Sequence, residues 1–418
     1  MSKRWGNPAA NAASTAALAA FALVGLGAVN TAAAQAPECS GKNAAISKSI
    51  KKPMAAAFDA VKAQNWPEVR TQVAAAQADD KPKSIYDEFW IHKLLGSANA
   101  GEKKYAEAGA ELSQITDSPC MSDADRLDNL KLLTQVYYQV DQYPKVIEYG
   151  NRALQAGAPA DFSLYVGQAY YLTQDFQNAV KVMKDVTAKL EAEGKPPGEQ
   201  NLRIIHGACS QLDDAACVSE QGEKLVKFYP KPEYWQNVVV SMMKPDTTDI
   251  QMLNIMRLAM QVGAMSTSDQ FTEMAEIALN TGLPGEAISA IEAGKAKSVF
   301  KGTRVADVQK MLERAKSAAD ADKKSLPQQE TSAKANAQGN ADVKLGAAYL
   351  SYGDPTKAIE VLNRGIAKGG VRNPDEAGLL LGIAYLKAGN KPEAAKAFDT
   401  VNKDATLTRV AKLWKLNT

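Results

Sequence analysis

The sequence reads GAAYLSYGDPTKAIEVL over residues 346–362 and GIAYLKAGNKPEAAKAF over residues 382–398. Two glycines, a tyrosine and an alanine occupy the same places in both stretches, and each is displaced by 36 residues. A shared offset at four positions indicates an internal repeat, in which one supersecondary unit is stacked many times. The matched pairs are Gly346 and Gly382, Tyr349 and Tyr385, Gly353 and Gly389, and Ala358 and Ala394.

Partial copies of this pattern run through the rest of the chain. The distance from Ala179 to Ala287 equals three repeat intervals, and the distance from Ala287 to Ala358 is close to two. Degenerate copies are therefore expected in the gaps. Asn99 stands where the pattern has tyrosine, and Val146 stands where it has alanine. The packing positions of the other copies are Trp66, Gly96, Ala108, Tyr137, Gly167, Tyr170, Ala179 and Ala287.

This pattern resembles the tetratricopeptide repeat (TPR), whose unit is two antiparallel helices in about 34 residues. The resemblance implies that glycine or alanine lets paired helices approach closely, while tyrosine fills the space beside them. Pro67, Pro144 and Pro392 fit the first turn of a second helix, where a missing N–H costs nothing. The expected fold is all-α, a right-handed α-solenoid of about ten antiparallel helix pairs forming a TPR-like superhelix, with a carboxy-terminal capping helix near residues 407–416.

The amino-terminal segment has the pattern of a secretory signal peptide. Lys3 and Arg4 precede an apolar run over residues 15–29, and small residues follow at Ala34 and Ala36. The run has about 15 residues, fewer than the ~20 that a helix needs to span a bilayer. We expect cleavage after Ala34 and a soluble periplasmic protein with no transmembrane span after signal cleavage.

Composition predicts a change of organisation near the middle of the carboxy-terminal half. Ala, Lys, Gln and Ser dominate residues 316–338, and Pro327 is expected to break any continuous helix there. The expected parts of the chain are a signal peptide (1–34), an extended segment (35–52), an amino-terminal TPR-like array (53–301), a degenerate repeat or hinge (302–338), and a TPR pair with the capping helix (339–418).

The four cysteines are expected to form disulfides, because an even number in an oxidising compartment favours pairing. Cys209 and Cys217 flank a predicted turn between two helices, so we expect them to pair. Cys39 and Cys120 would then pair by exclusion, which would tie the extended segment to a loop after the second repeat. The alternative is that the cysteines are small buried residues of the helices.

Composition and charge exclude several classes of function. The 418 residues are 45% hydrophobic and 23% charged, which is typical of a folded protein. Without Lys3 and Arg4 the chain has 47 basic and 47 acidic residues, so it lacks the positive charge of a nucleic-acid-binding protein. His92 and His206 are the two histidines, which excludes a multi-histidine metal site. Motifs for nucleophiles, phosphates or dinucleotides are absent, and we expect no enzyme activity, cofactor or metal.

The concave surface of a solenoid is the expected binding site, because the first helix of each unit lines it. Two roles are open for Tyr138 and Tyr171: contact with a partner, or filling the gaps between repeats. The candidates on the face opposite the packing residues are Lys131, Gln135, Tyr138, Gln168, Tyr171 and Arg203.

Together these features predict a periplasmic scaffold or adaptor without catalytic activity. It would bind envelope proteins or peptide segments during cell-envelope biogenesis, export or transport, and could associate peripherally with membrane complexes. Two alternatives are a small-molecule or lipid binder that uses the solenoid groove and a non-catalytic superhelical subunit of an envelope enzyme.

Overall fold

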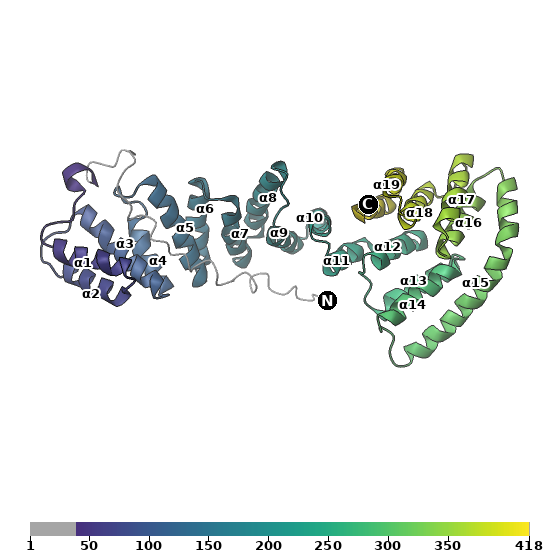
Figure 1. The fold of residues 1–418 in the computed structure, drawn as a ribbon, viewed down its shortest axis with the longest axis horizontal. Coiled ribbons are helices and arrows are strands. Elements are labelled where there is room, and N and C mark those ends of the chain that lie inside the picture. Colours follow the sequence, from purple (N-terminus) through teal and green to yellow (C-terminus); the bar gives the residue numbers. More distant parts are fainter. Residues whose placement is uncertain (1–38, 418) are drawn as a thin grey trace. The chain divides into compact units, whose positions relative to one another are not determined.

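A computed structural model describes residues 39–417 of the chain (Figure 1). The expected signal peptide and residues 35–38 lie outside this range. The described residues contain twenty α-helices, most of them in antiparallel pairs, which confirms the expected all-α, TPR-like fold. None of these helices combines the length and the apolar character that crossing a bilayer requires. The chain divides into two compact units between Gln221 and Gly222.

Unit 1 is an array in which each helix packs on its neighbours in the chain. A short 3-10 helix (Gly41–Asn43) lies in the segment that precedes the array. Figure 1 shows the pairs following one another in chain order. The helices are α1 (Lys51–Lys62), α2 (Trp66–Gln77), α3 (Ile85–Gly101), α4 (Tyr105–Ile115), α5 (Asp123–Gln139), α6 (Tyr143–Gln155), α7 (Ser163–Leu172), α8 (Phe176–Ala192) and α9 (Glu199–Gln211), with α10 (Ala215–Phe228) crossing the division.

Unit 2 contains three clear pairs, a long helix and a terminal helix. The pairs are α13 with α14, α16 with α17, and α18 with α19, and α11 packs more loosely on α12. The helices are α11 (Pro232–Met242), α12 (Asp249–Gln261), α13 (Ser268–Asn280), α14 (Pro284–Ala296), α15 (Arg304–Ala335), α16 (Asn340–Ser351), α17 (Pro355–Lys368), α18 (Pro374–Lys387), α19 (Lys391–Asp399) and α20 (Ala405–Trp414).

Glycine sets the distance between paired helices. In four pairs a glycine of the first helix faces a large side chain at the same position of the second helix, and a Cβ atom on that glycine would lie 2.1–2.6 Å from this side chain. Since packed atoms cannot approach so closely, a larger residue would push the helices apart. These contacts are Gly96 with Leu112, Gly167 with Met183, Gly346 with Leu362, and Gly382 with Phe398.

The second helices of the pairs pack through alanine. Ala108, Ala179, Ala287, Ala358 and Ala394 have no exposed surface. In three repeats the side chain at the tyrosine position bonds to the second helix of the preceding pair, so that its polar atom is satisfied at the repeat boundary. The bonded pairs are Tyr170 with Asn151 (3.0 Å), Tyr385 with Asn363 (3.2 Å), and the substituted Asn99 with Arg70 (2.5 Å).

The turn within a helix pair has a fixed conformation. The second residue before the second helix adopts a left-handed backbone, with φ between 52° and 80°. Glycine adopts this conformation without strain, whereas a side chain makes it costly. The two units differ in which residue they use there. Unit 1 has Gln64, Lys103, Asp141, Gln174 and Asp213, and unit 2 has Gly282, Gly353 and Gly389.

The helix α15 corrects the expectation that Pro327 interrupts residues 302–338. It runs without a break from Arg304 to Ala335 with Pro327 inside it. A proline inside a helix removes one hydrogen bond and costs about 3 kcal/mol. Contacts with α16 lie on both sides of the proline and offset this cost, because Tyr352 donates to Asp322 at 2.7 Å and Tyr349 donates to Glu330 at 3.1 Å.

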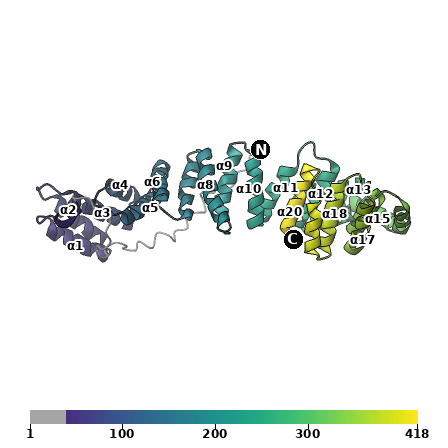
Figure 2. The ribbon, with the colours of Figure 1, turned by 90° about the horizontal axis from the view of Figure 1, so that it is seen from above.

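The terminal helix α20 covers the last pair, as expected of a capping helix, and also contacts α12. Trp414 stacks on Phe398 of α19, with ring centroids 6.2 Å apart. On the α12 side, the Gln251 amide donates to Asp404 at 2.8 Å. Figures 1 and 2 both place α20 beside α12. Unit 2 therefore closes on itself, which the repeat pattern did not predict.

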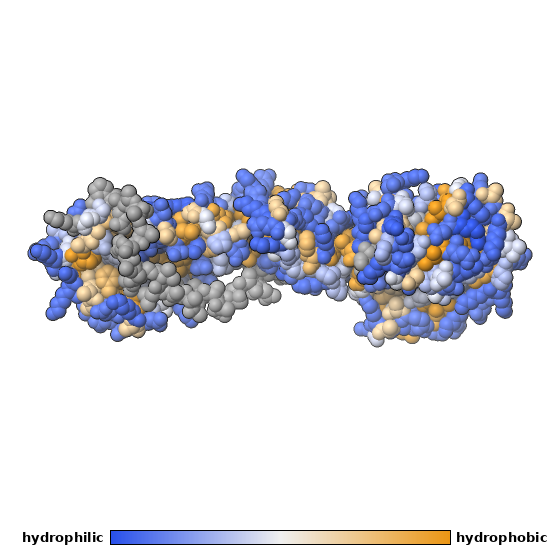
Figure 3. Space-filling view, turned by 45° about the horizontal axis from the view of Figure 1, so that its top comes forward, coloured by the Kyte–Doolittle hydropathy of each residue, from blue (hydrophilic) through white to orange (hydrophobic). Residues whose placement is uncertain are grey.

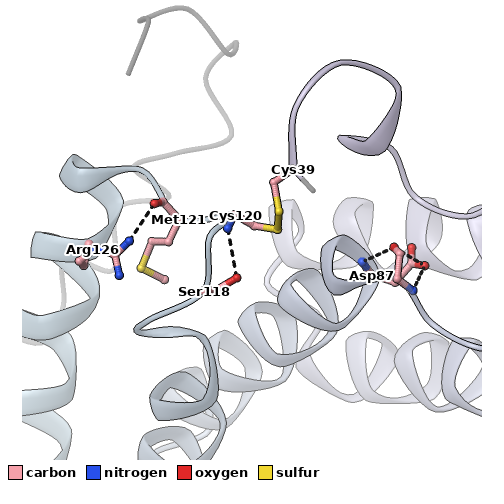
Figure 4. The surroundings of a disulfide bond; sticks show 7 residues. Cys39, Asp87, Ser118, Cys120, Met121 and Arg126 are labelled. Carbon is pink, nitrogen blue, oxygen red and sulfur yellow. Dashed lines mark hydrogen bonds between the residues drawn. A yellow bond between two sulfur atoms is a disulfide. The ribbon is translucent and has the colours of Figure 1, made fainter. Parts of the chain in front are cut away.

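Two disulfides join the four cysteines in the pairing that we expected. Cys209 is bonded to Cys217 across the turn between α9 and α10, and Cys39 is bonded to Cys120 in the loop after α4 (Figure 4). A second anchor of the amino-terminal segment is the buried carboxylate of Asp87, which accepts a backbone bond from Ser47 at 2.9 Å. Although burial alone would raise the pKa of Asp87, the hydrogen bonds from Ser47 and Ser84 lower it.

Candidate functional site

The six groove candidates lie on three successive first helices of unit 1. Lys131, Gln135 and Tyr138 belong to α5, Gln168 and Tyr171 to α7, and Arg203 to α9. All except Gln168 are partly exposed, and Gln168 is 5% exposed. The structure brings one pair of them into direct contact, because the Tyr138 hydroxyl donates to Gln168 Oε1 at 2.8 Å.

Tyr138 sits in an aromatic cluster that joins α5 to α7. Its ring makes edge contacts with Tyr165 at 5.3 Å and with Tyr143 at 6.2 Å between centroids. Burial raises the pKa of Tyr138, so the hydroxyl stays protonated and remains a donor to Gln168. The side chain thus fills the space between two repeats while part of its surface stays exposed.

Tyr171 has the corresponding position on the next first helix. A Cβ atom on Gly207 of α9 would lie 3.2 Å from the Tyr171 hydroxyl oxygen, so the ring lies against α9. Its other neighbour is Phe176, at 5.4 Å between centroids. Burial raises the pKa of Tyr171. Each of the two tyrosines therefore reaches from one first helix to the next, which favours the gap-filling role for most of the ring.

The amide of Gln168 has one buried atom without a hydrogen-bond partner in the described part of the chain. Its oxygen accepts the bond from Tyr138, but its Nε2 atom is buried and has no hydrogen-bond partner among the residues that the structure describes. A buried donor without a partner costs about 1–3 kcal/mol. The sequence identifies Gln168 as a candidate from its position, whereas its burial depends on the neighbouring helices.

The remaining candidates, on α5 and α9, are polar side chains as well. The Lys131 ammonium forms an ion pair of 2.7 Å with Asp128, one turn earlier on α5. Gln135 and Arg203 are half-buried. Figure 3 shows that hydrophilic residues cover most of one face of the molecule, with hydrophobic residues scattered among them.

Unit 2 contains a second candidate site that the sequence analysis missed. It is a cavity of about 190 Å³ between five helices that are not consecutive in the chain. One sign of it in the sequence is Arg257, a charged residue between the apolar residues Met256 and Leu258 of α12. The lining residues come from α12 (Arg257, Met260, Gln261), α14 (Glu286, Ser289), α16 (Ala347, Leu350, Ser351), α18 (Leu380, Ile383, Lys387) and α20 (Trp414).

A buried ion pair forms one wall of this cavity. Arg257 donates to both carboxylate oxygens of Glu286, at 2.7 Å each, and to Asn254 at 3.0 Å. Glu376 of α18 lies near this pair, and burial raises its pKa although Arg257 acts in the opposite direction. The arrangement fixes Arg257 and Glu286 in place and leaves their charges balanced.

The described residues contain no group of three His, Cys, Asp or Glu side chains placed to hold a metal ion. His92 is joined to Glu111 at 2.7 Å between α3 and α4, and burial lowers the pKa of His206.

Comparison with known proteins gives matches among solved structures alone. No family model matches the chain, and no curated protein matches its sequence. The TPR2AB domain of yeast Sti1, in a complex with pHSP90, has 13% identity and a TM-score of 0.25 and covers 71% of this chain and 100% of that chain. A tetratricopeptide repeat protein from Parabacteroides merdae has 11% identity and a TM-score of 0.26 and covers 69% and 98%.

The pentatricopeptide repeat protein PPR10 from maize has 12% identity and a TM-score of 0.32. It covers 87% of this chain, and the match spans 52% of PPR10.

Proposed function

We propose that this protein is a non-catalytic, exported scaffold whose unit 1 binds an extended segment of an envelope protein. The observation that carries the proposal is the buried Gln168 amide, whose Nε2 donor has no partner within the described chain. A carbonyl oxygen of a bound segment would supply the missing acceptor and recover the free energy that burial of the donor costs.

The geometry of the neighbouring residues supports a polypeptide ligand. The hydroxyl of Tyr138 fixes the orientation of the Gln168 amide, so the free donor is positioned before binding. Gln135 and Arg203 add further donors on the same series of first helices. A lipid would require an apolar groove, and this polar set of side chains favours a polypeptide over the lipid alternative.

Export and an envelope role are part of the proposal. They rest on the signal-peptide pattern of residues 1–34 and on the two disulfides, which persist in oxidising compartments. Cell fractionation of the full-length chain, with thiol labelling before and after reduction, would test both. Recovery in the cytoplasm with four reactive thiols would contradict the exported scaffold.

Site-specific photo-crosslinking in cells tests the binding face. We expect a photoreactive residue at Gln135 to capture an envelope protein, and the same residue at Gln177, exposed on the second helix α8, to capture none. The binding segment of the captured protein would then be titrated against variants of the purified protein. Equal crosslinking from Gln135 and Gln177 would overturn the assignment of the face.

The titration compares Gln168→Ala with Gln177→Ala, a matched change of the same residue type in the same repeat. We expect Gln168→Ala to weaken binding by about tenfold, since one hydrogen bond to a buried amide is lost, and Gln177→Ala to leave it unchanged. Circular dichroism of both variants controls for loss of the fold. Unchanged affinity in folded Gln168→Ala would show that this amide does not contact the ligand.

A further inference from the structure

We propose that the cavity of unit 2 binds a small organic monocarboxylate with an apolar body. This site goes beyond the proposed function, because it lies in the other unit and uses none of the groove residues. Its walls come from α12, α14, α16, α18 and α20, and the closure of α20 onto α12 completes it. The proposal rests on the charge, the free donor and the size of this cavity.

The charge of the lining favours an anion. Arg257 and Glu286 neutralise each other through two hydrogen bonds of 2.7 Å. Glu376, the carboxyl group near this pair, is not part of the lining, and burial favours its neutral form by raising its pKa. Lys387, exposed at the end of α18, is then the unbalanced charge of the lining, and no ion pair joins it to another residue of the described chain. A ligand carboxylate at the mouth of the cavity would neutralise Lys387 and gain a charge-assisted hydrogen bond.

A free hydrogen-bond donor lies in the wall formed by α20. Trp414 is 3% exposed and lines the cavity, and its indole Nε1 is buried without a hydrogen-bond partner in residues 39–417. A buried tryptophan N–H usually has a partner. Trp414 and Lys387 both belong to the lining, and an oxygen atom of a bound carboxylate would provide this acceptor.

The rest of the lining fits a short apolar body. Met260, Leu350, Leu380 and Ile383 contribute hydrophobic surface from three helices. The volume of about 190 Å³ is close to that of a cavity of about 150 Å³ that holds benzene, and it is well below the size of a site for a drug-sized molecule. The ligand class is therefore a monocarboxylate of roughly six to ten non-hydrogen atoms.

Calorimetric titration of the full-length mature protein with sodium hexanoate tests the proposal, with hexanol as the uncharged probe of the same chain length. We expect hexanoate to bind and hexanol to bind at least about tenfold more weakly, because it lacks the charge that Lys387 and Trp414 recognise. Equal binding of the two probes would overturn the anion specificity, and binding of neither would overturn the site.

Three variants locate the binding. We expect Lys387→Gln and Trp414→Phe each to weaken hexanoate binding about tenfold, since each loses one donor to the carboxylate. Lys412→Gln, which removes an exposed lysine of α20 outside the lining, is the matched control and should bind like the parent protein. Parent-like binding by both lining variants would overturn the assignment.

Lys387 is exposed, so its variant keeps the inference testable even if Trp414→Phe is unstable. The result is independent of the proposed function, because Gln168→Ala should leave hexanoate binding unchanged and Lys387→Gln should leave segment binding by unit 1 unchanged. Each proposal can therefore fail without the other.

Discussion

The two units are built from the same helix pairs but are held together differently. In unit 1 the tertiary hydrogen bonds span short distances along the chain, such as the 40 residues between Ser47 and Asp87. In unit 2 the bond between Gln251 and Asp404 spans 153 residues. Unit 1 is an open array, in which each helix packs on its neighbours in the chain. Unit 2 is closed, because its last helix, α20, packs against α12 of its first pair.

This difference indicates where each unit gains its stability. In an open array the free energy is close to a sum over the repeats and the interfaces between neighbours, so the ends are weakly held. Unit 1 restrains one end with the disulfide between Cys39 and Cys120, which are 81 residues apart. Unit 2 restrains its end by packing α20 against α12 and the last pair. A covalent bond and a packed helix thus serve the same purpose.

The largest expected effect is the loss of the Cys39–Cys120 bond. We expect the double variant Cys39→Ala and Cys120→Ala to lower the free energy of unfolding of unit 1 by about 4–5 kcal/mol, because the bond closes a long loop. The corresponding change at Cys209 and Cys217, which are 8 residues apart, should cost about 2–3 kcal/mol. Both bonds lie in unit 1, and chemical denaturation monitored by hydrogen exchange would show which of its helices each change destabilises. Equal losses would contradict a restraint that depends on loop length.

The next effect concerns the closure of unit 2. Trp414→Ala should destabilise unit 2 by about 3–5 kcal/mol, because it removes a buried aromatic side chain that stacks on Phe398 and faces the cavity. We expect faster amide exchange in α12 as well as in α20, while unit 1 is unchanged. If exchange rises in α19 and α20 but not in α12, the contact between the two ends does not stabilise the unit.

A pH-dependent effect of about 1–2 kcal/mol is expected at the contact between α15 and α17, after allowance for solvent screening. The Lys357 and Lys334 ammonium groups and the Tyr349 hydroxyl lower the pKa of Glu330 to about 2. Since this pKa is below the unfolded value of about 4.5, the stabilisation is complete above pH 4.5 and is lost as the pH falls through about 2. Unfolding free energies of the parent protein and Glu330→Gln, measured between pH 2 and pH 6, should converge at the acidic end. If the difference in unfolding free energy between the two proteins does not change with pH, ionisation of Glu330 is not the cause of the stabilisation.

The repeat pattern predicted the helix pairs because the residues that define them act locally. Glycine at the crossing meets a side chain of the very next helix in the chain, and proline in the first turn needs no distant partner. The uninterrupted helix at Pro327 could not be predicted in this way. Its cost is offset by contacts with Tyr349 and Tyr352, whose positions depend on how α16 packs.

The two candidate sites show the same limit. The position of Gln168 on a first helix follows from the repeat, but the burial of its amide depends on Tyr138, 30 residues earlier. The unit 2 cavity depends on helices between residues 249 and 414 that meet because α20 returns to α12. Arg257, between the apolar residues Met256 and Leu258, was a signal in the sequence, but the repeat pattern does not identify its partner Glu286.

The smallest expected effect concerns a turn position that occurs in both units. Lys103 in unit 1 and Gly389 in unit 2 have φ angles of 61° and 80° at the same place before a second helix. Lys103→Gly should stabilise unit 1, and Gly389→Ala should destabilise unit 2, each by about 1 kcal/mol, because glycine adopts the left-handed conformation without a steric penalty. Thermal unfolding of both variants gives the sign of each change. A loss of stability in Lys103→Gly would mean that the contacts of the lysine side chain stabilise unit 1 by more than the left-handed backbone conformation costs. The turns of the two units would then be stabilised by different interactions.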